Sequence, residues 1–523
     1  MRLFVKAAAL IALLVVARPA AAQITTAKVT GGEVAGTVTN GLSIFKGIPF
    51  AAPPVGPLRW KSPQPATPWT GVRQATNFGP GCMQDPGMAK VMGDTGRLSE
   101  DCLYLNVWTP AKSADEKRPV LVWIYGGGFT GGMTSIPLYD GANLAKRGVV
   151  FVSIAYRVGA FGFLAHPALS AESGHGSGNF GMLDMINGLK WVQANVGKFG
   201  GDPARVTLLG HSAGAFAVSM LAASPLAKGL FEGIIAESGA SFTPPRTGDE
   251  GGSNQPSLRL AESNGASFLA QIGAGDIAAA RALPASTIMD AALKLGPVAV
   301  RFWPPVDGYV VPDDQYALWQ AGRFSDVPIL IGSNSDEGAA FMGNRKPTPA
   351  GFEAEVRKDY GRKADTILGA YLHDDDADAF RATKQLARDT SFGWPAYTWA
   401  RLQSANGKAK VFLYYFDRPT AVAPDGTAHG IEVGYVFGNF RPRPNFTPGP
   451  DDFALSDRMQ RYWINFVTKG DPNGPGLPHW PEFRADAPVA MRLGDEAVPI
   501  SVPNWSKLDA LDDYYAWRRA GSK

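Results

Sequence analysis

The chain has 523 residues, of which 45% are hydrophobic and 11% aromatic, enough apolar material to build a large core. This composition excludes an intrinsically disordered chain. The formal net charge is +3, from 50 lysines and arginines against 47 aspartates and glutamates, and it gives no reason to expect nucleic acid, an anionic membrane or an acidic substrate as a partner.

The N-terminus has the pattern of an export signal. Arg2 and Lys6 precede an apolar run from Ala7 to Val16, and three alanines ending at Ala22 supply the small residues of a cleavage site. We therefore expect residues 1–22 to be a signal peptide and the mature protein to be periplasmic or secreted. Cleavage of this signal peptide removes Arg2, Lys6 and Arg18, so the mature protein has 47 basic and 47 acidic residues. No later run reaches about 18 apolar residues, so no membrane-spanning helix is expected.

The first segments of the mature chain predict hairpins and loops. From Lys28 to Phe50, Val, Thr and Phe alternate with Gly and Asn turns, which predicts antiparallel hairpins at the edge of a sheet. A Pro-rich stretch from Ala51 to Pro68 predicts an extended surface loop, as does a second stretch from Arg441 to Pro450.

The sequence contains two cysteines, Cys82 and Cys102. An exported chain folds in an oxidising compartment, which favours a disulfide between two cysteines. The spacing of these cysteines does not match that of zinc ligands, so we predict one structural disulfide. The bond would close a loop of about 20 residues and contribute about 3 kcal/mol in the chain-entropy model.

Buried strands alternate with helices along the rest of the chain. A helical apolar period runs from Met182 to Phe199, and the region from Leu258 to Leu295 has helical composition without a strand signal. Six short β-branched and aromatic runs predict strands buried on both faces: Val120 to Tyr125, Val149 to Tyr156, Val206 to Leu209, Gly233 to Ala236, Val327 to Ile331 and Lys410 to Tyr415. This alternation predicts one α/β unit over residues 23–523, with a mostly parallel sheet, helices on both faces and a helical insertion.

The strongest local motif is Gly210-His211-Ser212-Ala213-Gly214, placed between the strand ending at Leu209 and a helical run from Ala215 to Ala223. Strand, sharp turn and helix together are typical of a nucleophile turn, in which the flanking glycines let the backbone pass closely and the serine projects above the sheet. The alternative is an ordinary glycine-rich turn. We predict that Ser212 is a nucleophile.

A nucleophilic serine needs a base, and the base needs an orienting acid; in α/β-hydrolases both follow the serine in the sequence. The histidines beyond the serine turn are His373, His429 and His479. His373 opens an acidic run typical of a solvated helix face, and His479 lies in a Pro-rich loop. His429 follows a strand and a loop and is favoured as the base.

The loop from Gly332 to Gly338 follows a buried strand, and open α/β sheets place ligands at such carboxyl ends. Asp336 and Glu337 in this loop are both candidate acids, and either could instead cap the next segment. Asp307 is better explained as a turn residue.

Gly126, Gly127 and Gly128 directly follow the strand from Val120 to Tyr125. A glycine run there allows backbone amides to approach a substrate and stabilise an oxyanion, although a flexible loop is the alternative.

The spacing of a dinucleotide-binding motif, G-x-G-x-x-G, occurs at Gly176, Gly178 and Gly181. No predicted strand precedes these glycines, so we expect no dinucleotide site.

Two long stretches of this sequence resemble signatures of the type-B carboxylesterase family. One is EDCLYLNVW from Glu100, and the other runs from Phe199 to Gly214 through the serine turn. Further similar stretches are FKGIPFAAPPVGPLRW from Phe45, WIYGGGF from Trp123, SNSDEG from Ser333 and AHGIEVGYVFG from Ala428.

The resemblance implies an α/β-hydrolase fold and a serine esterase that cleaves small-molecule esters through an acyl-enzyme, without metal or cofactor. By position in the family motifs it implies Glu337 as the acid, His429 as the base, and the amides of Gly127, Gly128 and Ala213 as the oxyanion donors. It also implies that the two cysteines form the family's first disulfide. The oligomeric state and the natural ester stay open.

Two features differ from relatives within the family. Position 211 is His where many relatives have Glu, so it could change the charge near the nucleophile or simply pack. The loop from Cys82 to Cys102 contains no tryptophan to hold a quaternary ammonium, so choline esters are not expected as substrates.

Phe129, Trp303 and Phe341 suggest an apolar pocket. Alternative functions are a non-catalytic cholinesterase-like adhesion module and an amide or carbamate hydrolase using the same site.

Overall fold

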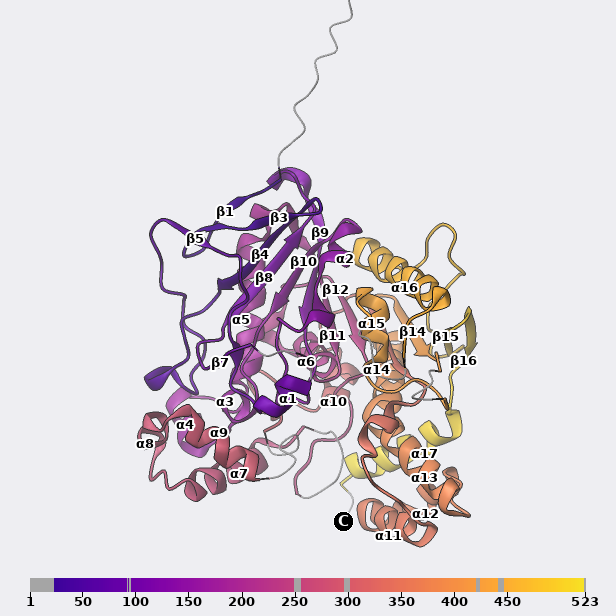
Figure 1. The fold of residues 1–523 in the computed structure, drawn as a ribbon. Coiled ribbons are helices and arrows are strands. Elements are labelled where there is room, and N and C mark those ends of the chain that lie inside the picture. The colour runs from indigo at the N-terminus through magenta and orange to yellow at the C-terminus, as the bar shows by residue number, and fades with distance from the viewer. Residues whose placement is uncertain are drawn as a thin grey trace, which may run out of the picture.

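A large sheet forms the centre of the computed structural model, which describes residues 23–91, 93, 96–248, 255–295, 302–419, 424–440 and 446–521 (Figure 1). Within these residues the sheet has eleven strands. Their spatial order is β3 (Thr37–Thr39), β4 (Leu42–Pro49), β8 (Tyr104–Thr109), β10 (Val150–Ile154), β9 (Arg118–Ile124), β11 (Gly201–His211), β12 (Gly233–Glu237), β13 (Ile329–Asn334), β14 (Val411–Phe416), β15 (Val489–Leu493) and β16 (Ala497–Ser501). The predicted signal peptide lies outside the described residues, as does part of the predicted loop from Arg441 to Pro450.

The neighbouring strands from β10 to β15 are all parallel, whereas β3, β4 and β8 at one edge and β16 at the other pair antiparallel. Each of the six predicted buried runs forms a strand of this sheet, and β10, β12 and β13 are buried along their whole length because side chains on both of their faces are covered. The predicted mostly parallel sheet is confirmed.

The N-terminal prediction is correct in part. β3 and β4 form an antiparallel edge of the main sheet, but β1 (Thr26–Val29) and β2 (Gly32–Ala35) belong to a separate small sheet with β5 (Val72–Gln74). The returning chain is fixed there because the amide of Trp69 donates to the carbonyl of Gly31 and its indole donates to that of Glu33.

Helices cover both faces of the sheet (Figure 1). On one face α2, α15 and α16 pack against the strands, and on the other α5, α6, α10 and α14 form a second layer. The helices are α1 (Pro86–Val91), α2 (Ala142–Lys146), α3 (Gly159–Phe163), α4 (Pro167–Ser173), α5 (Phe180–Asn195), α6 (Ala213–Ala223), α7 (Leu258–Gln271), α8 (Ile277–Ala282), α9 (Ala285–Lys294), α10 (Gln315–Gln320), α11 (Pro349–Tyr360), α12 (Ala364–Ala370), α13 (Asp376–Arg388), α14 (Trp394–Asn406), α15 (Ile431–Phe437), α16 (Pro450–Lys469) and α17 (Trp505–Arg519).

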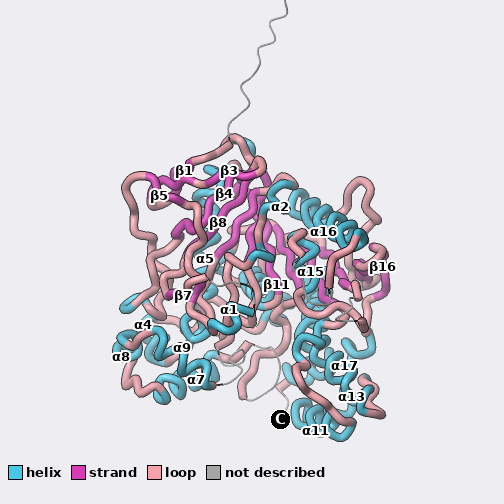
Figure 2. Tube along the Cα trace, viewed as in Figure 1, coloured by secondary structure: helices cyan, strands magenta, loops and turns pink. Residues whose placement is uncertain are grey.

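The predicted helical insertion is present as α7, α8 and α9, between β12 and β13 in the chain. Figure 2 shows these helices gathered with α4 at one corner of the molecule, and α11, α13 and α17 at another. Among the described residues, no helix combines the length and the apolar character needed to cross a bilayer.

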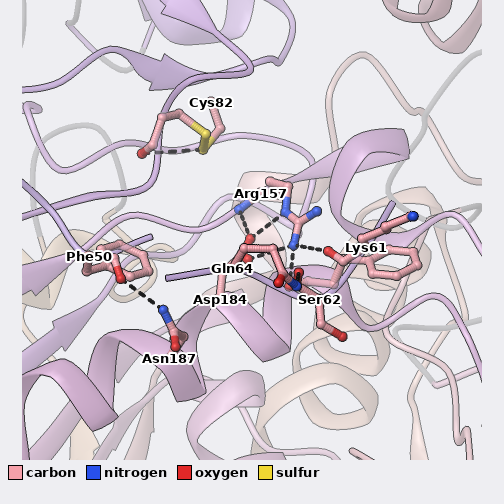
Figure 3. A network of polar contacts seen from close by, with 10 residues as sticks. Phe50, Lys61, Ser62, Gln64, Cys82, Arg157, Asp184 and Asn187 are labelled. Carbon is pink, nitrogen blue, oxygen red and sulfur yellow. Dashed lines mark hydrogen bonds and ion pairs between the residues drawn. A yellow bond between two sulfur atoms is a disulfide. The ribbon is translucent and has the colours of Figure 1, made fainter. Parts of the chain in front are cut away.

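A buried ion pair ties the extended Pro-rich segment to the core (Figure 3). The guanidinium of Arg157 binds Asp184 of α5 at 2.7 and 2.8 Å and also donates to the carbonyl of Lys61 at 2.9 Å. Nearby, the side chain of Asn187 donates to the carbonyl of Phe50. Burial raises the pKa of Asp184, and the charge and hydrogen bonds of Arg157 oppose that rise.

The three glycines of the dinucleotide-like pattern have a packing role. A Cβ on Gly181 would lie 2.4 Å from the carbonyl oxygen of Arg157, and a Cβ on Gly176 would lie 2.4 Å from that of Asp307. Gly178 has a φ of +95°. The segment follows helix α4 and not a strand, so it lacks the geometry that dinucleotide binding needs.

The disulfide between Cys82 and Cys102 is present and buried. It closes the loop that contains α1 and β7 (Leu98–Ser99), and β7 pairs with β6 (Gly81–Cys82) where the loop begins.

Candidate active site

Ser212 lies on the sharp turn between β11 and α6, as predicted. Its φ of +55° is rare for a non-glycine residue and holds the side chain out of both the strand and the helix. The flanking glycines are required sterically: a Cβ on Gly210 would lie 2.3 Å from the carbonyl oxygen of Gly214, and one on Gly214 would lie 2.0 Å from that of Ile124. The amide of Ser212 donates to the carbonyl of Glu237 at 2.8 Å, which fixes the turn on β12.

The three side chains predicted as nucleophile, base and acid lie in series. Nε2 of His429 is 2.8 Å from Oγ of Ser212, and Nδ1 of His429 is 2.5 Å from Oε2 of Glu337. They come from different strand ends, because Ser212 follows β11, Glu337 follows β13 and His429 lies between β14 and α15. Ser212 and His429 are partly exposed, whereas Glu337 is fully buried.

Hydrogen bonds between two loops set this arrangement. The amide of Asp336 donates to the carbonyl of Thr427 at 2.9 Å, and the side chain of Asn334 donates to the carbonyl of Ala428 at 2.9 Å. The amide of Asn334 also donates to Oε1 of Glu337 at 2.7 Å, so both carboxylate oxygens of Glu337 are bonded. The loop that carries the histidine is therefore held directly against the loop that carries the acid.

The structure separates the two candidate acids. Glu337 contacts the imidazole, whereas Asp336 points away and forms a buried ion pair with Lys384 at 2.8 Å. Asp307 accepts backbone hydrogen bonds from Tyr309 and Val311, as a turn residue does.

The pKa of His429 is raised by its surroundings. Burial of the ring alone would lower this pKa, but the charge and hydrogen bond of Glu337 and the charge of Glu432 outweigh burial. An imidazolium formed at this position is therefore stabilised, which is what a base needs when it takes a proton during a reaction.

The glycine run passes directly over the serine turn. A Cβ on Gly126 would lie 2.8 Å from Cβ of Ser212, and Gly127 and Gly128 have positive φ values of +125° and +61°. Among the described residues, no acceptor takes a hydrogen bond from the amides of Gly127 and Gly128, and both glycines are partly exposed. Ala213 is the first residue of α6, where backbone amides have no partner within the helix.

Two aromatic rings contact His429, and a second group of aromatic rings packs together close to the serine turn. Phe392 stacks on His429 with ring centroids 4.6 Å apart, and Phe341 lies 5.5 Å from the same ring. The predicted pair Phe129 and Trp303 is in contact at 4.9 Å, and Phe216 packs against Trp303 at 5.5 Å.

Sequence reasoning missed three of the residues around the site. Phe216 could have been found, because it follows Ser212 by one helical turn. Glu432 gave no helical signal, because His429 lies before the start of α15. Phe392 gave no signal, because it is presented by a π-helical segment, Asp389–Gly393, between α13 and α14.

The parallel sheet, the serine turn at the end of β11 and the partners that follow it in the chain define an α/β-hydrolase. The model of the carboxylesterase family matches residues 18–504, and the chain belongs to the type-B carboxylesterase family. It is a carboxylic ester hydrolase.

Relatives support this assignment along nearly the whole chain. The fumonisin B1 esterase of Sphingopyxis macrogoltabida is 37% identical, over 89% of this chain and 85% of the relative. The phenmedipham hydrolase of Pseudarthrobacter oxydans is 32% identical, over 91% of this chain and 96% of the relative. The para-nitrobenzyl esterase of Bacillus subtilis (strain 168) is 34% identical, over 92% of this chain and 97% of the relative. A solved structure of a PNB esterase superposes with a TM-score of 0.83 at 32% identity, covering 94% of this chain and 99% of that one.

Proposed function

We propose that this protein is an exported serine esterase that uses Ser212, His429 and Glu337 as a catalytic triad. The observation that carries the proposal is the unbroken hydrogen-bonded series from hydroxyl to imidazole to carboxylate. A serine hydroxyl is a weak nucleophile at neutral pH, and this series is the arrangement that activates it.

In the first half of the reaction, Oγ of Ser212 bonds to the ester carbonyl carbon while its proton passes to Nε2 of His429. Glu337 stabilises the resulting imidazolium, and the amides of Gly127, Gly128 and Ala213 donate to the oxyanion. The tetrahedral intermediate then breaks its bond to the alcohol oxygen, which receives the proton from His429, and an acyl-enzyme remains.

Water completes the cycle by the same steps. His429 takes a proton from water as the water oxygen bonds to the acyl carbon, and the bond to Oγ of Ser212 breaks as the proton returns to that oxygen. The products are the carboxylic acid and the free enzyme. Every proton and electron pair is accounted for by these side chains and water, so the proposed steps require no cofactor.

The aromatic rings of Phe341 and Phe392 beside His429 favour neutral esters with an apolar acyl or alcohol group, because these rings offer apolar contact and no fixed charge. An adhesion module is disfavoured, because such a module has no use for an intact triad.

The test is turnover of a short-chain nitrophenyl ester by the full chain and by Ser212→Ala. We expect the variant to lose turnover by at least about 10³-fold, because the proposed acyl-enzyme forms on Oγ of Ser212. Retained turnover in the folded variant would mean that the nucleophile is wrong. Export is tested separately by N-terminal sequencing of the mature protein, which should begin at Gln23.

A further inference from the structure

A second carboxylate lies behind His429 and has no place in the proposed steps. Glu432, on α15, is fully buried. Its Oε1 accepts from the hydroxyl of Ser238 at 2.7 Å, and its Oε2 accepts from the side chain of Asn334 at 2.5 Å. Two donors that converge on one buried carboxyl group favour its ionised form.

A second imidazole lies beside this carboxylate. His211 is buried, its ring centroid is 4.8 Å from that of His429, and its Nε2 is 3.6 Å from Oε1 of Glu432. Within the described part of the chain, neither ring nitrogen of His211 has a hydrogen-bond partner. A buried nitrogen left without a partner is costly, and Oε1 of Glu432 is an acceptor 3.6 Å from Nε2.

We propose that His211 is a positioning residue whose Nε2–H donates to Glu432, and that this second imidazole–carboxylate pair keeps Glu432 ionised behind His429. The separation of 3.6 Å exceeds a hydrogen bond by about half an ångström, so the proposed hydrogen bond requires a small rotation of the His211 ring toward Glu432. The inference rests on the proposed esterase function, because it concerns the base of that reaction.

The charges around the pair support this role. Burial holds the pKa of His211 well below its ordinary value and the charge of His429 lowers it further, so His211 is a neutral donor. Burial first, and then the charge of Glu337, raise the pKa of Glu432 to about 7, although His429, Asn334 and Ser238 oppose the rise. The other titratable groups that interact with Glu432 are Glu237, Tyr139 and Tyr414, and burial raises the pKa of each of them. The two tyrosines are therefore uncharged at neutral pH.

The ionisation of Glu432 therefore changes near neutral pH. An ionised Glu432 adds to Glu337 in raising the pKa of His429, and it stabilises the imidazolium of the transition state. If His211 stops donating, the pKa of Glu432 rises and the carboxyl group becomes protonated. His429 then loses this stabilisation and its pKa falls.

The experiment compares the pH dependence of kcat/KM for the full chain and for His211→Phe, His211→Gln, Glu432→Gln and the double variant His211→Phe/Glu432→Gln. Phe keeps a ring against His429 but has no donor, whereas Gln keeps an N–H donor near the position of Nε2. We expect His211→Phe and Glu432→Gln each to move the acid limb to lower pH by about one unit and to lower kcat about tenfold.

His211→Gln should restore the position of the acid limb, and the double variant should match the single variants, because both changes remove one carboxylate charge. An unmoved limb in His211→Phe, or additive shifts in the double variant, would overturn the inference. If His211→Phe does not fold, Glu432→Gln must still move the limb, and an unmoved limb there overturns the inference as well. Absence of Ser212-dependent turnover in the full chain would instead refute the proposed function.

Discussion

The charge of Glu337 is the part of the site whose contribution can be worked out most directly. In Glu337→Gln the side chain keeps its size, but the carboxylate 2.5 Å from Nδ1 of His429 becomes a neutral amide. In the proposed mechanism, the imidazolium that forms when Ser212 loses its proton then has no counter-charge from Glu337. The variant should therefore fold and bind ester but react slowly.

The magnitude follows from the geometry. The charges of the Glu337 carboxylate and the His429 imidazolium, about 4 Å apart, attract by about 4 kcal/mol at an effective dielectric constant of 20. A hydrogen bond from the imidazolium to the amide of the variant would still contribute about 1 kcal/mol. A loss of about 3 kcal/mol in the transition state lowers kcat by about 10²-fold.

The pH dependence has a definite sign. In the intact protein, burial lowers the pKa of His429, but Glu337 and Glu432 outweigh burial and raise it. Removing the charge of Glu337 lowers this pKa, so the acid limb of kcat/KM should move to lower pH by about 1 to 3 units.

The assay is the kcat and the pH profile of nitrophenyl ester hydrolysis, with Asp336→Asn as the matched control. Asp336 is the neighbouring residue and pairs with Lys384, away from the imidazole. We expect its variant to keep kcat within a few-fold and to leave the acid limb in place. Equal losses in both variants, or an unmoved limb in Glu337→Gln, would refute the electrostatic reasoning.

Three further predictions concern stability, each measured by chemical or thermal unfolding. Reducing the disulfide should lower the free energy of unfolding by about 3 kcal/mol, and equal melting curves with and without reductant would contradict this. Gly214→Ala should sharply reduce folded protein, because its Cβ would lie 2.0 Å from the carbonyl oxygen of Ile124, whereas Gly197→Ala, with open space around its Cβ, should be tolerated. Arg157→Met should cost about 3 to 5 kcal/mol at neutral pH by leaving Asp184 unpaired, and the loss should shrink as pH falls because Asp184 becomes protonated; a pH-independent loss would count against an electrostatic cause.

The fold could be predicted largely from the sequence because its signals are local. Strands such as Val120 to Tyr125 are apolar on both faces, and the turn around Ser212 needs glycines at fixed spacing. The separate sheet of β1, β2 and β5 could not be predicted, because Trp69 makes its fixing contacts with residues more than 30 positions away.

The site could be predicted only in part for the same reason. From the sequence pattern alone, Asp336 and Glu337 are equally good candidates for the acid, because the two are neighbours in one loop. Only the fold shows that one faces His429 and the other faces Lys384. Phe392 reaches the imidazole through a π-helical segment, which has no periodic pattern to detect.

The most direct test of the proposed triad is where a fluorophosphonate probe attaches. After incubation of the full chain with the probe, digestion and mass spectrometry should find the phosphonyl group on the peptide that contains Ser212, and His429→Ala should label at least about 10²-fold more slowly. Stoichiometric labelling of a different residue, or unchanged labelling of the folded Ser212→Ala variant, would contradict the account.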